Sequence, residues 1–148
     1  MSRATQLELF PDLKVDSFDI LIDRPEVLQS KIQDADIVSI HIPLNKDTEG
    51  MIDKEKLSWM KDGALLVNTA RAQIINEKDL FNELKSKRIK TALDVFWEEP
   101  YDGIILGVDT NNLIATPHLA STCKEFLINA EEDFFNFLNV LNESLNIT

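Results

Sequence analysis

The sequence predicts an α/β domain built on a mostly parallel β-sheet. After residue 17, short apolar runs alternate with helical patterns, which is typical of strands joined by crossover helices. The 148 residues are 44% hydrophobic, and a chain of this length and composition has enough apolar surface for one folded domain. Polar side chains also gather where the apolar runs end, and open parallel sheets bind their ligands at that edge.

Four elements are expected before residue 61. Pro25 suits the first turn of a helix, Pro43 closes an apolar run, and Asp53 is a good N-cap. In chain order, the predicted elements are a strand at 17–22, a helix at 25–34, a strand at 36–42 and a short helix at 54–60.

The second half of the chain is organised around the apolar run 64–67. This run follows a glycine-containing turn at 61–63 and stops at Asn68, so it predicts a buried strand. Asn76 is the expected N-cap of the next helix, in which apolar residues recur at helical spacing. The remaining predicted elements are a helix at 77–87, a strand at 90–95, a loop at 98–112, a strand at 113–116 and a long helix at 122–145.

Charge and composition exclude several functional classes. The formal net charge is −11 and the isoelectric point is about 4.5, which disfavours binding to nucleic acid or to an anionic membrane. One cysteine and two histidines leave no disulfide framework and no expected metal site. Because the sequence has neither a secretory leader pattern nor a long apolar run, we expect a cytoplasmic protein.

Three of the predicted strands end near side chains that suit acid–base chemistry. Arg71 follows one strand, Glu99 the next and His118 the last. A guanidinium binds anions, and a paired carboxylate and imidazole move protons. Plainer roles remain open: Arg71 as the surface partner of an acid, Glu99 as an ordinary loop acid, and His118 as a strand cap. For His41, inside an apolar run, a core or supporting role is favoured.

Several linked motifs resemble the nucleotide-binding domain of the D-isomer-specific 2-hydroxyacid dehydrogenases. The match covers about residues 34–125 in the family's order. Its segments are ADIVSIHIPL at 35–44, TEGMID at 48–53, MKDGALLVNTAR at 60–71, ALDVFWEEP at 92–100 and TPH at 116–118. The resemblance implies a Rossmann-like doubly wound sheet, so residues 1–148 are expected to be part of an NAD-binding domain.

The resemblance also implies a role for each matched side chain. Arg71 corresponds to the arginine that holds the substrate carboxylate and carbonyl, and a guanidinium suits this because it binds carboxylate bidentately. His118 corresponds to the general acid and base, and Glu99 to the carboxylate that orients the imidazole. The implied substrate is a small 2-keto or 2-hydroxy acid.

The cofactor implied by the resemblance is NAD, with NADP as the alternative. Asp94 corresponds to an aspartate on the nicotinamide side. Pro43, Thr69 and Ala70 correspond to positions that line the cofactor, largely through their backbone.

The sequence departs from the family pattern in what it lacks. Its four glycines do not form the Gly-x-Gly-x-x-Gly loop that holds the pyrophosphate. The first β-α-β unit, which carries that loop, and the separate substrate domain are therefore expected to be absent from these residues. Two further differences follow His118: Ser121 stands where the family usually has glycine, and Cys123 where it often has threonine.

Three hypotheses follow from these matches and departures. The first is a dehydrogenase fragment that is inactive alone, and the second is one half of a split enzyme whose N-terminal part is another chain. The third is a non-catalytic interaction or regulatory module, because a fold does not determine its function. Loss of a central strand exposes apolar surface, so we also expect homo-oligomers, such as dimers, or association with a complementing chain.

Overall fold

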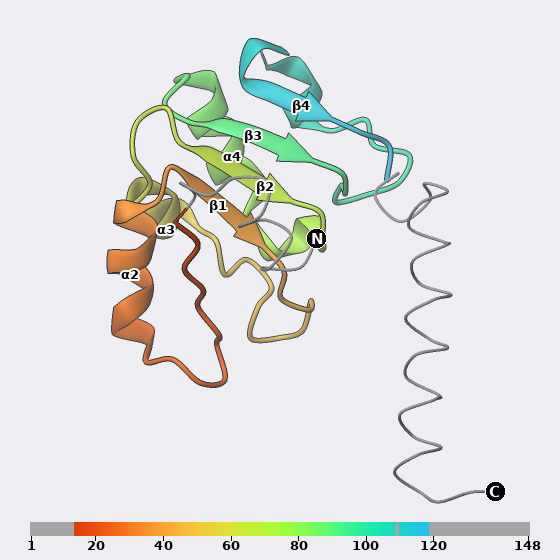
Figure 1. Cartoon of the computed structure of the whole chain (residues 1–148). Coiled ribbons are helices and arrows are strands. Elements are labelled where there is room, and N and C mark those ends of the chain that lie inside the picture. The colour runs from red at the N-terminus through yellow and green to blue at the C-terminus, as the bar shows by residue number, and fades with distance from the viewer. Residues whose placement is uncertain (1–13, 109, 119–148) are drawn as a thin grey trace, which may run out of the picture.

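The computed structural model describes residues 14–108 and 110–118. Within them, four parallel strands form one sheet in the order β1-β2-β3-β4 (Figure 1). The strands are β1 (Ile37–Ile40), β2 (Leu65–Asn68), β3 (Lys90–Leu93) and β4 (Leu113–Ala115). The sequence predicted each of these strands close to its observed bounds, and the α/β class with a parallel sheet is confirmed.

The helices begin where the sequence predicted them. Asp53 accepts a hydrogen bond from the backbone N–H of Lys56, and Asn76 accepts one from Asp79, so both predicted N-caps are confirmed. The α-helices are α2 (Pro25–Asp34), α3 (Lys54–Ser58) and α4 (Glu77–Lys85), and the 3₁₀ turns are η1 (Ala72–Ile74), η2 (Ile104–Gly107) and η3 (Thr110–Asn112).

Helices α3 and α4 cover the same face of the sheet. The strand order follows the chain order, so successive right-handed crossovers place their helices on one side. The two helices contact each other and lie behind the sheet in the view of Figure 1. Leu57 of α3 and Leu80 of α4 belong to one buried cluster with Leu66 of β2. This covered face is therefore the core of the described residues.

The opposite face of the sheet is apolar and only partly buried. Side chains alternate between faces along a strand, and the strand register places Ile37, Leu65 and Ile114 on the side away from Leu66. Ile37 is 56% exposed and Ile114 is 65% exposed. Within the described residues, β1 pairs with β2 alone, so its outer edge is open as well.

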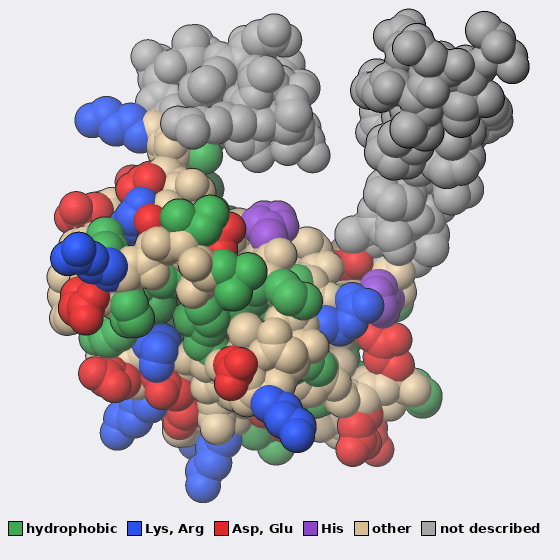
Figure 2. Space-filling view, turned by 90° about the horizontal axis from the view of Figure 1, so that it is seen from below, with side chains coloured by type: hydrophobic (Ala, Val, Ile, Leu, Met, Phe, Trp, Pro, Cys, Tyr) green, Lys and Arg blue, Asp and Glu red, His purple; other side chains and the backbone are tan. Residues whose placement is uncertain are grey.

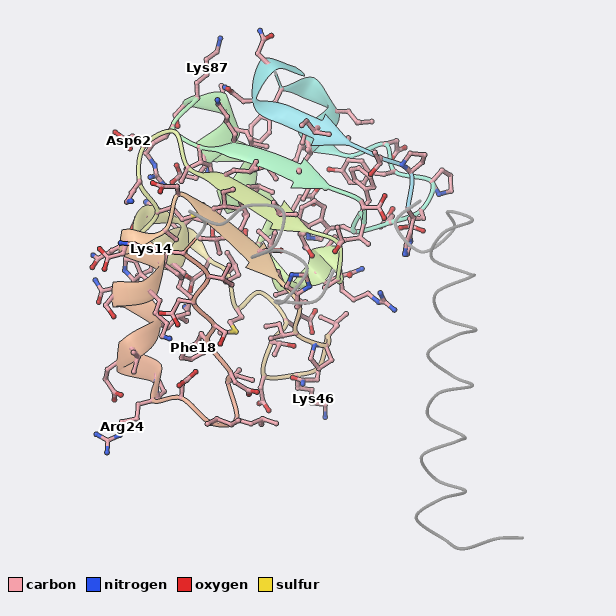
Figure 3. All side chains as sticks on the ribbon, in the orientation of Figure 1. Lys14, Phe18, Arg24, Lys46, Asp62 and Lys87 are labelled. Atoms are coloured by element: carbon pink, nitrogen blue, oxygen red, sulfur yellow. The ribbon has the colours of Figure 1, made fainter. Side chains whose placement is uncertain are left out.

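Charged side chains of both signs lie at the periphery. Arg24, Lys46, Asp62 and Lys87 lie at the outside of the ribbon in Figure 3. Figure 2 shows hydrophobic side chains in the middle of one face with charged side chains around them. None of the helices in residues 14–108 and 110–118 has the length and apolarity needed to cross a bilayer.

The strand predicted at 17–22 is wrong. Asp19 instead organises a turn: its backbone oxygen accepts hydrogen bonds from Ile22 and Asp23, and its carboxylate accepts one from the N–H of Leu21. Aspartate favours such local bonds over a strand ladder. Leu21 and Ile22 are consequently 91% and 81% exposed, although their apolar side chains suggested a strand.

Some predictions concern residues that the structure does not describe. The long helix at 122–145 lies outside the described residues, and so do Ser121 and Cys123. The helix at 122–145 and the effects of Ser121 and Cys123 therefore stay predictions.

Candidate active site

The candidate catalytic side chains all follow strands of the same sheet. Arg71 comes after β2, Glu99 after β3 and His118 after β4. The three strands are parallel, so their carboxyl ends share one edge, where open α/β sheets bind ligands. Segments that are distant in the sequence thus meet at one edge of the fold.

His118 and Glu99 are directly hydrogen-bonded. The imidazole Nδ1 lies 3.0 Å from Glu99 Oε1 and 3.3 Å from Oε2. Both side chains remain open to solvent, at 42% and 49% exposure. His118 has a φ of 55°, a region that residues other than glycine seldom adopt and that often marks functional sites. A carboxylate on Nδ1 fixes the ring orientation and leaves Nε2 for another partner.

Arg71 lines an open hollow beside the end of β2. This hollow has a volume of about 420 Å³ and is lined by His41, Ile42, Pro43, Leu44, Ala70 and Arg71. The structure therefore brings together three predicted site residues: Pro43, Ala70 and Arg71. Within the described residues, the guanidinium donates a hydrogen bond of 2.6 Å to Ala70 O and is joined to neither Glu99 nor His118. Thr69 is exposed at the same turn.

Asp94 connects the ends of the three strands. It is 4% exposed, and its Oδ1 accepts a hydrogen bond of 2.5 Å from the Thr116 hydroxyl. Its backbone N–H donates to Asn68 O at 3.1 Å. Thr116 O in turn accepts the N–H of His118 at 2.9 Å. Asp94 therefore lies between the turn that carries Arg71 and the turn that carries His118.

The loop that carries Glu99 is anchored on both sides. Before it, the Trp97 indole donates to Ile75 O, and the Gln73 amide donates to Trp97 O, both at 3.0 Å. After it, the Tyr101 hydroxyl donates to Glu77 and accepts the N–H of Ile105. Sequence reasoning missed these anchors, although a tryptophan and a tyrosine in an apolar segment each require a polar partner.

Tyr101 gives a testable pH signature for this anchor. Burial, with the hydrogen bond to Glu77, raises the pKa of Tyr101 from 10.0 to about 12. The folded chain keeps this proton to higher pH than the unfolded chain, so the free energy of unfolding should fall as pH rises from 10.0 toward about 12. Tyr101 is the single tyrosine of the sequence, so tyrosinate absorbance reports it alone. We expect the absorbance titration of Tyr101 to have its midpoint near pH 12 in the folded chain and at about pH 10 in urea. Equal midpoints in the two states would contradict a buried, hydrogen-bonded Tyr101.

His41 is not a core residue. It is exposed, it lines the hollow beside Arg71, and its Nε2 lies 2.8 Å from the Ser39 hydroxyl. Of the two expected roles, the core position is wrong, because β1 ends at Ile40 and is an edge strand in the described residues. The supporting role stays a prediction. Apolar neighbours in the sequence could not reveal this, because they do not show which strand lies at an edge.

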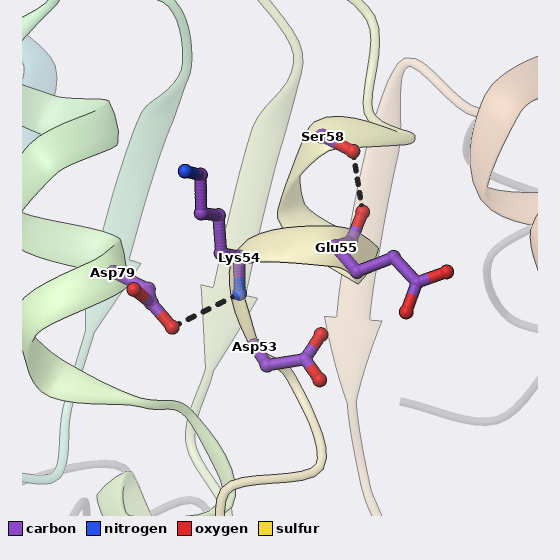
Figure 4. Close-up of a pocket in the computed structure, with 5 residues that line it drawn as sticks. All are labelled: Asp53, Lys54, Glu55, Ser58 and Asp79. Atoms are coloured by element: carbon purple, nitrogen blue, oxygen red, sulfur yellow. Dashed lines mark hydrogen bonds between the residues drawn. The ribbon is translucent and has the colours of Figure 1, made fainter.

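A second hollow lies at the start of α3 and is acidic. It is lined by Asp53, Lys54, Glu55, Ser58 and Asp79 (Figure 4). Asp79 accepts the N–H of Lys54 at 3.0 Å, and Asp53 is occupied as the N-cap of the helix. Among the described residues, no group of three or more His, Cys, Asp or Glu side chains is arranged to hold a metal ion. These acids therefore serve the helix ends.

Comparison with known proteins identifies the family. The family model described as "D-isomer specific 2-hydroxyacid dehydrogenase, NAD binding domain" matches residues 14–120. The chain is 44% identical over 107 residues to an (S)-sulfolactate dehydrogenase of Chromohalobacter salexigens, covering 70% of this chain and 34% of that protein. It is 40% identical over 121 residues to a glycerate dehydrogenase of Methylorubrum extorquens, covering 76% and 37%.

Solved structures agree with the sequence relatives. A D-lactate dehydrogenase from Aquifex aeolicus, complexed with NAD and lactic acid, has a TM-score of 0.64 at 25% identity and covers 85% of this chain and 45% of that one. An acyclic imino acid reductase in complex with NADPH and D-Arg has a TM-score of 0.63 at 33% identity, covering 80% and 38%. The chain spans about a third of the length of the curated relatives that it matches. It belongs to the D-isomer-specific 2-hydroxyacid dehydrogenase family, as part of the NAD-binding domain.

Proposed function

We propose that this chain supplies the catalytic edge of an enzyme that interconverts small 2-keto and 2-hydroxy acids with a nicotinamide cofactor. The observation that carries the proposal is the hydrogen bond between His118 and Glu99 at the same sheet edge as Arg71. Three related proteins act, by their names, on sulfolactate, glycerate and lactate, all of which are 2-hydroxy acids. They support the substrate class and not a particular member of it.

Each of the three side chains has one task in this proposal. Arg71 binds the substrate carboxylate and polarises the carbonyl, because its planar fork stays charged and forms paired hydrogen bonds. His118 gives a proton to the carbonyl oxygen during reduction and removes it during oxidation. Glu99 holds the ring through Nδ1, so that Nε2 faces the reacting oxygen. The nicotinamide, when bound, supplies or accepts the hydride.

The residues present fit one half of that cofactor. Pro43 and Ala70 line the hollow beside Arg71, Thr69 lies at the same turn, and Asp94 is a buried carboxylate next to the His118 turn. We propose that these four residues face the nicotinamide half. The pyrophosphate has no cradle here, since the glycines of the sequence do not form a Gly-x-Gly-x-x-Gly loop. Both NAD and NADP therefore remain within the proposal.

We propose that a complementing β-α-β unit covers the open side of the sheet. The outer edge of β1 has no neighbour among the described strands, and Ile37, on the partly buried face, is 56% exposed. A parallel sheet is normally covered on both faces. A second copy of the chain is the alternative cover. Light scattering on the purified 148-residue chain separates the two possibilities, because only the second predicts the molar mass of a dimer.

The single cysteine is in keeping with a cytoplasmic location, which we also propose.

The first test titrates NADH into the 148-residue chain while its fluorescence is followed. Without a pyrophosphate cradle, we expect binding weaker than about 1 mM and no oxidation of NADH when glyoxylate or pyruvate is added. Micromolar binding with turnover would show that these residues are sufficient and would contradict the need for a complementing unit.

The second test places the same residues in a complete fold. In a chimera, residues 14–120 of this chain replace the matching segment of the (S)-sulfolactate dehydrogenase. We expect NADH-dependent turnover that uses Arg71, Glu99 and His118 of this chain. A chimera that melts cooperatively and binds NADH, but turns over no 2-keto acid, would refute the proposed function.

A further inference from the structure

Asn68 is a fully buried polar residue at the end of β2. Its side chain has 0% exposure, and it belongs to the covered face of the sheet together with Leu66. In the strand register it pairs with Ile40 on one side and Leu93 on the other. A buried amide among apolar neighbours is unfavourable unless both its donor and its acceptor are satisfied.

Both ends of the Asn68 amide bind the backbone of the turn that leads to Arg71. Oδ1 accepts the N–H of Ala70 at 3.0 Å, and Nδ2 donates to Arg71 O at 2.9 Å. Arg71 O also accepts the N–H of Ile74 at 3.3 Å, which begins η1. The amide therefore fixes the backbone on both sides of the Arg71 Cα atom.

No other common side chain of this size makes both bonds. An ionised aspartate keeps the acceptor for Ala70 but puts a second acceptor against Arg71 O. A serine hydroxyl keeps one bond and loses the other, and leucine makes neither. The Arg71 side chain is exposed, and its guanidinium donates a hydrogen bond to Ala70 O in the same turn. The backbone of this turn therefore directs the side chain.

We infer that Asn68 is a positioning residue that presents Arg71 to the carboxylate of the substrate. The identity of the substrate in this inference rests on the proposed function. The geometry rests on the two hydrogen bonds of the Asn68 amide. The inference assigns to Asn68 a larger effect on binding of the 2-keto acid than on the nicotinamide cofactor. Nδ2 holds Arg71 O directly, whereas the Ala70 N–H keeps an acceptor when serine replaces Asn68.

The first experiment measures the turn itself in the full 148-residue chain. Asn68→Ser keeps the acceptor for Ala70 without adding a charge, and Asn68→Asp keeps the shape. Amide exchange and ¹⁵N relaxation at Ala70 and Arg71 should show a turn as ordered as β2 in the native chain and a mobile turn in both variants at neutral pH. In Asn68→Asp the order should return at low pH, because a protonated carboxyl donates where the amide did.

The second experiment separates the inference from the proposed function. In the chimera, we expect Asn68→Ser to raise the KM for the 2-keto acid about tenfold and to raise the KM for NADH by a smaller factor, because Thr69 and Ala70 of the same turn face the cofactor. Asn82→Ser, at an exposed position on α4, is the matched control and should change neither. Turnover with an unchanged KM for the 2-keto acid would overturn the inference and keep the function.

The remaining outcomes are equally decisive. If the chimera with unsubstituted Asn68 shows no turnover, the proposed function is wrong. The amide-exchange data would still test, independently, whether Asn68 orders the turn. If Ala70 and Arg71 stay ordered in both Asn68 variants, the amide does not hold the turn and the inference is wrong. Cooperative melting of Asn68→Ser, followed by circular dichroism, establishes that a folded variant was measured.

Discussion

Replacing His118 with alanine in the chimera is expected to lower kcat for 2-keto acid reduction by about 10³-fold, the middle of the range for loss of a general acid. The reason is local: the imidazole is the proton donor of the proposed reaction, and Glu99 on its Nδ1 holds it in place. Binding of NADH should be unchanged. Single-turnover oxidation of NADH measures the chemical step without product release.

Glu99→Gln provides the graded comparison for His118. The amide keeps the size of the side chain and loses the charge, so we expect a smaller fall in kcat than in His118→Ala. Glu98→Gln is the matched control, because Glu98 is the exposed neighbouring acid and no part of the proposed reaction. A His118→Ala chimera that keeps its chemical rate would contradict the acid–base role directly.

Arg71→Ala is expected to raise the KM for the 2-keto acid by about 10²-fold or more, as loss of a paired, charge-assisted hydrogen bond requires. Arg71→Lys should recover only part of this, because an ammonium keeps the charge and loses the planar fork. The KM for each 2-keto acid and the KM for NADH, measured in the chimera, separate substrate binding from cofactor binding.

Arg24→Lys is the control for replacing an arginine outside the candidate site, because Arg24 lies at the periphery near the start of α2 (Figure 3). It should leave both constants unaltered. If Arg71→Ala leaves the KM for the 2-keto acid at its native value, Arg71 is a surface residue and the anion site lies elsewhere.

Local signals in the sequence were sufficient for most elements of this fold. Pro25 begins α2 because its fixed φ and missing N–H suit a first helical turn. Asp53 and Asn76 cap their helices as predicted, because the cap depends on contacts within three residues. The end of β2 was predictable for a similar reason, because its apolar run gives way to the polar residues Asn68 and Thr69.

What the sequence concealed depends on partners that are distant along the chain. The segment 17–22 is apolar enough for a strand, but none of the described strands pairs with it, and Asp19 forms a turn instead. The same limit applies to His41, whose exposure follows from the position of β1 at an edge.

Sequence motifs proposed the members of the candidate site and did not reveal the hydrogen-bond network around them. Matching motifs predicted Arg71, Glu99 and His118 one by one. The bond from Thr116 to Asp94, which joins β4 to β3, and the two bonds of the Asn68 amide appear only when the strands are assembled. Threonine and asparagine are common at strand ends, so their types alone carried no such signal.

The central claim is that Arg71 and His118 act on one substrate molecule. A crystal structure of the chimera with NADH and oxamate, a 2-keto acid analogue, tests it most directly. The account predicts that the Arg71 guanidinium binds the oxamate carboxylate and that His118 Nε2 lies about 3 Å from the carbonyl oxygen of the same molecule. Oxamate held by Arg71 with His118 Nε2 directed into solvent would contradict it.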